Sequence, residues 1–416
     1  MTMKRARMTV GVVVSALVVL AGCNSGSPSR SRAAGGAVRS ETTTTSSTTT
    51  TTTNMTATTR FPAQRVAAGG VTADCLGGPP LEGARGSADR NSLRMVSAQK
   101  GFAVDDTAIV VTDDGRTWTR RYSGSDPMFS VDAVDPDHAW AVGQQILMAT
   151  SDGGRSWQPV GEPDQGMLRV VDFIDAQNGW GVTGNHVFRT VDGGRTWQHT
   201  DPPCGGEAVC FTGPDDGWAA TGPNVYRTTN GGDSWQPAFT VPVDDLDSPF
   251  NSQSVHGSQL RCARPGVAWV YFTGRASGSH IAYAAYRGTA AGEWTPVMKE
   301  PEAGPRAVHA PAGGTDPGPM WALGADSAMY VSFTPLAGPP ANLTLREATD
   351  GGRRLGPARP IQGVFSATSI SFLSPEVGWV LGAKAGSSAV DAILATTDGG
   401  QTWQEQYTYA VPPPAG

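Results

Sequence analysis

The sequence contains little charge and no concentration of basic residues. Only 16% of its 416 residues are Asp, Glu, Lys or Arg, and the formal net charge is −6. A protein that binds DNA or RNA usually carries a basic stripe or a high isoelectric point, so we expect no nucleic-acid partner. Solubility alone explains a modest acidic balance of this kind.

Motifs of metal and nucleophile chemistry are also missing. The six histidines are scattered, with neither an H-x-x-H nor a C-x-x-C spacing. There is no serine nucleophile elbow, phosphate-binding loop or redox motif. The densest acidic cluster, Asp244, Asp245 and Asp247, lacks the ligand pattern of an EF-hand loop, so it is interpreted as a solvated loop rather than a calcium site. We therefore predict no catalytic residue, no metal and no cofactor.

No apolar run near the N-terminus is long enough to span a bilayer. The run at residues 9–20 is shorter than the roughly 20 residues that a transmembrane helix needs. Basic residues precede it, and L-A-G-C follows, ending at Cys23. This arrangement resembles a bacterial lipoprotein signal, which implies removal of residues 1–22 and attachment of lipid to the Cys23 thiol. The protein is then expected on the outer side of the cytoplasmic membrane, held by the lipid alone.

The segment after the signal has too few apolar residues to fold. The run E-T-T-T-T-S-S-T-T-T-T-T-T at residues 41–53 has no apolar periodicity and buries nothing that could offset chain entropy. We predict a disordered Ser/Thr-rich stalk at 23–70, open to O-glycosylation, and an N-terminal lead-in at 71–90. A flexible tail is expected at 409–416.

Cysteines are few, and their number suggests disulfides. If Cys23 carries a lipid, four cysteines remain, an even count in an exported protein. Three pairings are possible. Cys204 and Cys210 flank the short loop C-G-G-E-A-V-C, so we favour this pair and expect Cys75 to bond Cys262. Some of the four could instead be free buried thiols.

Glycine and tryptophan are abundant, with 53 and 12 residues respectively. This composition is typical of many short strands joined by tight turns. A turn sequence close to D-G-G-R-T-W recurs, and its tryptophans at 118, 157, 197 and 235 are about 40 residues apart. Upstream of most copies stands a second tryptophan among small or apolar residues, as in G-W-G-V-T at Trp180.

Seven such units occupy residues 91–408 and absorb all 12 tryptophans, with Phe102 and Leu355 in the two remaining slots. The third unit contains four candidate strands, M-L-R-V-V-D-F-I-D, G-W-G-V-T, H-V-F-R-T and T-W-Q-H. A period of about 40–50 residues with four strands per unit is typical of β-propeller blades. The predicted fold is therefore an all-β, seven-bladed β-propeller of four-stranded antiparallel blades.

The recurring turn is predicted to be structural. Glycine supplies the positive φ of a tight hairpin, and Asp or Asn accepts N–H groups of the next residues. Asn at position 230 can do this but is a poor general base, and seven symmetric copies do not suit one active site. The tryptophan is expected to pack between blades. The predicted turn residues are Asp113, Asp152, Asp192, Asn230, Asp350 and Asp398.

These turns resemble the Asp-box, or bacterial neuraminidase repeat, with the pattern S/T-x-D-x-G-x-T/S-W. Together with the preceding G-W sequence, they most resemble the photosystem II stability and assembly factor family. The resemblance covers residues 91–408. It implies a propeller, and it suggests an assembly or quality-control role for a membrane complex. It is specific for fold and weak for function.

Some relatives of the Asp-box repeat are glycosidases, so a glycoside hydrolase is the alternative. Sialidases carry an F/Y-R-I-P motif, and the nearest string here is R-F-P at 60–62, in another order and before the repeats. An endoglucanase would need two facing carboxylates about 5–9.5 Å apart. The sequence does not exclude that arrangement.

A polar position recurs on the first strand of each unit, eight residues before the G-W slot. Its mainly apolar neighbours place its side chain on the opposite face of the innermost strand. It is predicted to form salt bridges and hydrogen bonds between blades, with a ligand-binding channel as the alternative. The residues are Arg94, Asp132, Asp172, Cys210, Arg261, Gly313 and Ser371.

The rim opposite the recurring turns varies most, because it carries the long links 237–259 and 295–319. Long loops on a rigid scaffold often carry specificity. We therefore expect a monomeric binding or assembly scaffold whose partner is an envelope protein or glycan. The alternative is that these loops are disordered spacers. The candidate binding residues are Asp244, Asp245, Phe250, Arg275 and His280.

Overall fold

The computed structural model describes most of the chain from Ser92 to Tyr409. Within this stretch the description omits residues 164, 165, 185, 243–254, 256, 265, 278, 279, 300–315, 335–341 and 387–389. The predicted signal, stalk and lead-in lie outside the described residues, as do residues 410–416 of the predicted tail. The described part contains no helix, and therefore none long and apolar enough to cross a membrane.

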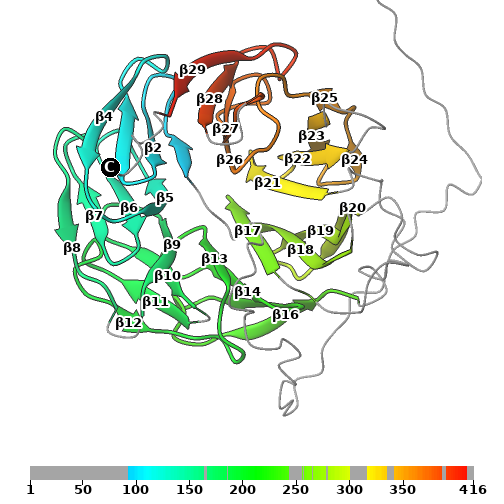
Figure 1. Ribbon diagram of the computed structural model, residues 1–416. Helices are drawn as coiled ribbons and strands as arrows, with labels where there is room; N and C mark the ends of the chain where they lie inside the picture. Colours follow the sequence, from blue (N-terminus) through cyan, green and yellow to red (C-terminus); the bar gives the residue numbers. More distant parts are fainter. Residues whose placement is uncertain are drawn as a thin grey trace, which may run out of the picture. The chain divides into compact units, whose positions relative to one another are not determined.

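Seven antiparallel sheets surround a common centre, which confirms the predicted seven-bladed all-β propeller (Figure 1). Blades 1 to 4 consist of β1 (Leu93–Met95), β2 (Gly101–Asp105), β3 (Ala108–Thr112) and β4 (Trp118–Ser123); β5 (Met128–Ala133), β6 (Ala139–Gly143), β7 (Leu147–Thr150) and β8 (Gln158–Val160); β9 (Leu168–Phe173), β10 (Gly179–Thr183), β11 (His186–Thr190) and β12 (Gln198–His199); β13 (Ala208–Phe211), β14 (Gly217–Thr221), β15 (Asn224–Thr228) and β16 (Gln236–Thr240).

Blades 5 to 7 are built in the same way from consecutive strands, except that β25 joins blade 6 by pairing with β23. Their strands are β17 (Gly257–Ala263), β18 (Val267–Ser277), β19 (His280–Thr289) and β20 (Trp294–Lys299); β21 (Asp316–Ala322), β22 (Ala328–Thr334), β23 (Asn342–Thr349), β24 (Arg354–Leu355) and β25 (Arg359–Pro360); β26 (Ser369–Phe372), β27 (Gly378–Ala383), β28 (Asp391–Thr396) and β29 (Gln404–Thr408).

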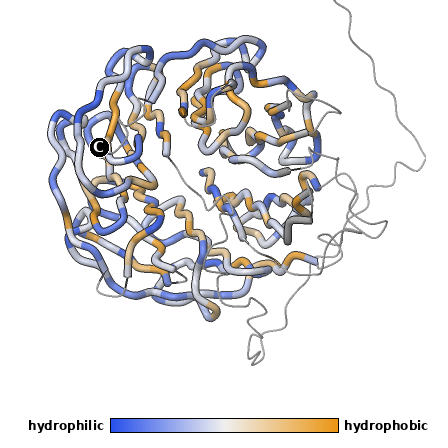
Figure 2. Tube along the Cα trace, in the orientation of Figure 1, coloured by the Kyte–Doolittle hydropathy of each residue, from blue (hydrophilic) through white to orange (hydrophobic). Residues whose placement is uncertain are grey.

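Burial decreases from the centre of each blade to its outer edge. The second strands β2, β6, β10 and β14 are buried along their whole length, because neighbouring sheets cover both of their faces. The fourth strands, such as β8 and β16, are mostly exposed. Figure 2 shows the same gradient, with hydrophobic residues on the inner strands and hydrophilic residues on the outer strands and turns.

The hydrophobic core is divided into seven clusters, one in each interface between neighbouring blades. Tryptophans of the G-W sequence connect these interfaces. Trp140 of blade 2 stacks on Phe173 of blade 3 at 3.6 Å between ring centres. Its indole N–H donates to the carbonyl of Gly193, also in blade 3, at 3.0 Å. Tryptophans of the recurring turn also pack between blades, as predicted: Trp157 meets Phe102 of blade 1 edge-on.

Side chains join the first blade to the last. The Ser371 hydroxyl of β26 accepts the Met95 N–H of β1 at 2.9 Å. The Gln406 side-chain oxygen accepts the indole N–H groups of Trp118 and Trp379, each at 3.1 Å, and its amide donates to the Gly115 carbonyl at 2.9 Å. Gln406 therefore connects blade 7 to blade 1 through its hydrogen bonds with Trp118 and Gly115, and it also bonds Trp379 of its own blade.

Candidate functional site

The recurring turns between third and fourth strands, here called the acidic turns, hold themselves together as predicted. The Asp192 carboxylate accepts the backbone N–H groups of Arg195 and Thr196 at 3.0 and 2.9 Å, and the Thr196 hydroxyl at 2.6 Å. The Thr190 hydroxyl donates to the same carboxylate and accepts the Gly194 N–H. Asp192 thus closes the turn.

Other acidic turns repeat this geometry. Asp152 and Asp398 accept the N–H and the hydroxyl of the residue four positions later. Hydrogen bonds from the hydroxyl and N–H of Ser156 hold the pKa of Asp152 well below its usual range. Asn230 accepts the Ser234 N–H at 3.0 Å with its amide oxygen. Since an amide serves equally well, these positions are structural.

Two predicted turn residues were wrong. In blade 1, Asp114 rather than Asp113 accepts the turn N–H groups, from Arg116 and Thr117. This turn is one residue shorter, which shifts the closing carboxylate relative to the tryptophan; Asp113 instead forms ion pairs with Lys100 and Arg121.

In blade 6 the turn has a different geometry. Asp350 itself adopts a positive φ of 54°, and its carboxylate lies 3.8 Å from the guanidinium of Arg353. Among the described residues, that carboxylate accepts no backbone N–H of the turn. The reason is the sequence T-D-G-G, which lacks the residue that separates Thr from Asp in the other turns.

The polar position on the first strands forms bonds between blades, which confirms the structural reading. Asp132 accepts the Phe173 N–H of the next blade at 2.7 Å, and Asp172 accepts the Phe211 N–H of the blade after that at 2.8 Å. Phe173 comes directly after Asp172, and Phe211 comes directly after Cys210. The bonding partner in the next blade is therefore in both cases the residue that follows that blade's own polar position. Ser371 and Met95 repeat this relation across the seam of the ring. Gly313 lies outside the described residues.

Arginine at this position reaches several neighbours. The Arg94 guanidinium donates to the Ala133 carbonyl at 3.2 Å and lies 3.6 Å from the Asp132 carboxylate. It also lies 4.8 Å from the ring centre of Trp321 in blade 6. The polar groups on these inner strands are therefore largely engaged with one another.

Burial dominates the electrostatics of Asp172. Removal from water, reinforced by the nearby Asp132 carboxylate, raises the pKa of Asp172 to about 7. The Phe211 N–H and the charges of Arg94 and Arg261 oppose this rise only in part. The Asp172 carboxyl therefore titrates near neutral pH while it links blades 3 and 4.

The disulfide pairing that we favoured is wrong. Cys210 bonds Cys262, with their Cα atoms 5.5 Å apart, rather than Cys204. Alternation along β13 directs Cys210 toward blade 5, whereas Cys204 packs in the cluster between blades 3 and 4, so the two face opposite sides of blade 4. Cys204 is also disulfide-bonded, and its partner lies outside the described residues. The predicted pairing of Cys75 with Cys262 is excluded as well.

The Cys210–Cys262 disulfide is a covalent form of the bond between first strands. Cys262 lies one residue beyond Arg261, the position equivalent to Cys210 in the next blade. Asp132 and Asp172 reach their partners with the same offset. The residue type at this position thus decides whether two blades share a hydrogen bond or a sulfur–sulfur bond.

An apolar pocket lies between blades 6 and 7, on the rim formed by the second-to-third strand turns and the links between blades. We call this the opposite rim, because the acidic turns lie at the other ends of the strands. The pocket is open to solvent and has a volume of about 220 Å³. Its lining comes from the start of β21, the end of β22, the start of β23 and the link before β26, and consists of Pro317, Gly318, Phe333, Leu343, Ser366 and Ala367.

Phe365 adjoins the pocket in sequence and is 38% exposed. No sequence pattern predicted this pocket. Its residues are ordinary apolar and small types from three strands and a link, without a shared motif. Only the register between strands brings them together.

The predicted binding residues are only partly described. Asp244, Asp245 and Phe250 lie outside the described residues. Arg275 and His280 belong to β18 and β19, whose backbones pair as far as Ser277 and His280, but their side chains lie outside the described part. These strands have 11 and 10 residues, against five in β10 and β11, so this hairpin extends the opposite rim at blade 5.

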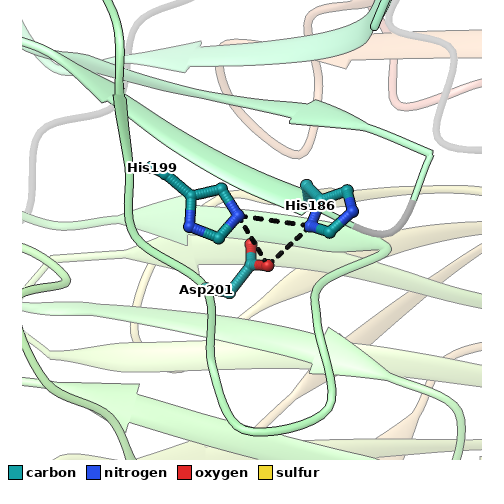
Figure 3. A group of neighbouring side chains, drawn as sticks. All are labelled: His186, His199 and Asp201. Atoms are coloured by element: carbon teal, nitrogen blue, oxygen red, sulfur yellow. Dashed lines mark hydrogen bonds and ion pairs between the residues drawn. The ribbon is translucent and has the colours of Figure 1, made fainter. Parts of the chain in front are cut away.

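A group of possible metal ligands lies at the outer edge of blade 3 (Figure 3). His186, His199 and Asp201 bring three ligand atoms to within 4.8 Å of one another. No familiar spacing marks them, because His186 and His199 stand on different strands. We expected no metal site because the sequence has no H-x-x-H or C-x-x-C spacing, and that criterion does not detect this group.

Comparison with known proteins finds distant similarity to solved structures. No protein-family model and no curated protein matches this chain. The solved structure of YCF48 bound to D1 peptide is similar at 17% identity and a TM-score of 0.49, over 75% of this chain and 92% of that chain. YCF48 from Cyanidioschyzon merolae has 17% identity and a TM-score of 0.47, over 67% and 84%. The β-propeller domain of the Trilobed protease from Pyrococcus furiosus has 9% identity and a TM-score of 0.46, over 78% and 99%.

Proposed function

We propose that this protein is an exported, lipid-anchored, non-catalytic scaffold that binds another protein of the cell envelope through its opposite rim. Cys23 would carry the lipid, and the Ser/Thr-rich residues 23–70 would hold the propeller away from the membrane surface. The acidic turns would belong to the Asp-box repeat. The apolar pocket between blades 6 and 7 is the observation that carries the proposal.

The pocket suits an apolar side chain of a partner. A dry cavity of about 150 Å³ accommodates benzene, and this pocket of about 220 Å³ is larger. Phenylalanine and leucine line it, and Phe365 stands beside it in sequence. Because such a lining offers few hydrogen bonds to sugar hydroxyls, it favours a protein over a glycan.

The other two repeated features are engaged within the protein. Acidic-turn side chains such as Asp152 and Asp192 accept hydrogen bonds from their own turns. Asp132 and Asp172 accept bonds from the next blade. These features support a rigid scaffold, and specificity on such scaffolds is usually carried by the rim loops.

Partner capture by crosslinking in intact cells, followed by mass spectrometry, tests the proposal. Ala367→Leu should fill the pocket and reduce capture. Changing the exposed Arg116, Arg155 and Arg195 to Ser on the acidic-turn rim is the matched control and should leave capture intact. If capture survives Ala367→Leu but is lost in the triple variant, the partner binds the acidic-turn rim and the proposal is wrong.

A further inference from the structure

We propose that His186, His199 and Asp201 form a binding site for one divalent transition-metal ion, with Zn²⁺ the best match. The site lies on the outermost strands of blade 3 and is independent of the pocket on the opposite rim. It uses Nδ1 of His186, Nε2 of His199 and a carboxylate oxygen of Asp201 (Figure 3).

Strand register brings the three side chains together. Phe188 pairs with His199 across β11 and β12, and the Thr200 N–H donates to the Val187 carbonyl beyond the last paired residues. Since side chains alternate between faces, His186 and His199 lie on one face. Continuing the same register places Asp201 opposite His186 on that face.

The donor atoms are close to metal-ligand spacing. Nε2 of His199 lies 3.3 Å from Nδ1 of His186. Two ligands on a tetrahedral zinc ion with Zn–N bonds of about 2.0–2.1 Å are separated by about 3.3 Å. The Asp201 oxygen lies 2.6 and 2.9 Å from these two nitrogens. These two separations would need to lengthen by about 0.7 and 0.4 Å to reach the same geometry.

One ion can use both imidazole nitrogens at this distance. The same 3.3 Å contact fits one imidazole N–H that donates to the lone pair of the other, and a cation takes the place of that proton. Imidazole suits zinc, copper, iron and nickel, and zinc also accepts a carboxylate oxygen. Ordinary His–Asp pairing needs only one imidazole, as His138 and Asp135 of blade 2 show.

The site is accessible and preorganised. The side chains of His186 and His199 are 42% and 46% exposed, so an ion can enter and keep water in its remaining positions. The other oxygen of Asp201 accepts the Val187 N–H at 2.6 Å, which orients the carboxylate. A bound ion would fasten the two-residue strand β12 to β11, just before the link that carries Cys204.

Titration of the full chain, purified without a polyhistidine tag, tests the site. We expect saturable one-to-one binding of Zn²⁺ by calorimetry, a nitrogen- and oxygen-ligand visible spectrum with Co²⁺, and a rise in melting temperature with Zn²⁺ that EDTA reverses. His186→Ala and His199→Ala should each weaken binding by more than about tenfold, because loss of even an indirect ligand partner costs that much.

Two further variants keep the result decisive. His138→Ala removes a histidine that pairs with a single aspartate, and it should leave Zn²⁺ affinity unchanged. Asp201→Asn can still accept the Val187 N–H, so its circular dichroism should match the wild type while Zn²⁺ affinity falls. Absence of saturable binding to the wild type overturns the proposal. So does binding that survives both His186→Ala and His199→Ala, or that falls equally in His138→Ala.

Discussion

A single side chain closes each acidic turn. That side chain can be a carboxylate or an amide, but its length and position do not change. Asp192 and Asn230 accept equivalent bonds with a carboxylate and an amide oxygen. The turn therefore needs an acceptor of this length at this position, with glycines at positive φ beside it, such as Gly193 and Gly194. A negative charge is not required.

Asp192→Ala should lower the free energy of unfolding by about 1–2 kcal/mol, similar to the loss of a helix N-cap, because the turn N–H groups lose their acceptor. Asp192→Asn should cost much less, since position 230 uses the same group naturally. Urea denaturation of both variants measures the difference. Equal losses in the two variants would show that charge matters and would contradict a structural role.

The partly buried carboxyl of Asp172 predicts a dependence of stability on pH. Its pKa is about 7 in the folded protein, against about 3.9 in an unfolded chain. Between these values the folded state holds the proton and the unfolded state does not, so the free energy of unfolding falls as pH rises from about 4 to 7.

Asp172→Asn should remove this contribution, because an amide accepts the Phe211 N–H without ionising. Relative to the wild type, the variant should gain stability between pH 4 and pH 8, on the order of 1.4 kcal/mol per unit of pKa shift. Denaturation at several pH values measures the gain, with the exposed Asp175→Asn as control. Parallel pH profiles for wild type and Asp172→Asn would refute the assignment.

The sequence predicted residues that act within a single turn. It did not predict a group whose side chains come from two different strands. Asp152, Asp192, Asn230 and Asp398 follow from their own short sequence. The histidine–aspartate group does not, because the register between β11 and β12 was needed to bring it together.

At the scale of elements, this polar position links first strands of neighbouring blades, as from β5 to β9, from β9 to β13 and from β13 to β17. Alternation along the strand predicted that a polar side chain faces away from its apolar neighbours. It could not predict the partner, because the offset of one residue depends on how neighbouring blades are staggered. Because of that offset Cys262 is the partner of Cys210. The pairing of Cys210 with Cys204, which we predicted from their closeness in sequence, was therefore wrong.

Changing both Cys210 and Cys262 to Ser should lower the free energy of unfolding by about 2–4 kcal/mol through the larger freedom of the unfolded chain. Chemical denaturation without reductant measures the loss. Peptide mapping under non-reducing conditions provides the control, since Cys204→Ser alone should leave the Cys210–Cys262 link intact. A peptide in which Cys204 is joined to Cys210 would contradict the structure.

At the scale of the whole molecule, counting repeats predicted the number of blades. Seven units with two tryptophan slots each gave seven sheets, because one blade cannot bury both faces and a closed ring can. The pocket between blades 6 and 7 was not predictable in this way, since it depends on side chains from two blades, of which blade 6 departs from the repeat.

Closure of the ring should depend on Gln406. Gln406→Ala removes two hydrogen bonds between blades 1 and 7 and one within blade 7, and it leaves two indole N–H groups without an acceptor, so the free energy of unfolding should fall by about 2–4 kcal/mol. Gln404→Ala, an exposed position on the same strand, should have little effect. Similar losses in the two variants would show that Gln406 has no special role in closure.

Lipid anchoring is tested on the intact protein in cells. Cys23→Ser removes the thiol expected to carry the lipid, so the propeller should leave the membrane fraction and the signal should no longer be processed in the same way. Fractionation and immunoblotting measure both. A variant that stays quantitatively in the membrane fraction, with its signal uncleaved, would contradict the lipoprotein assignment.

The offset between first strands gives each blade two unlike sides, one that supplies the bond and one that receives it. Each blade is also a single continuous stretch of chain. A unit copied and inserted between two others would therefore find a matching surface on both sides without exchanging any strand. Such a ring can gain or lose members by duplication or deletion of one repeat.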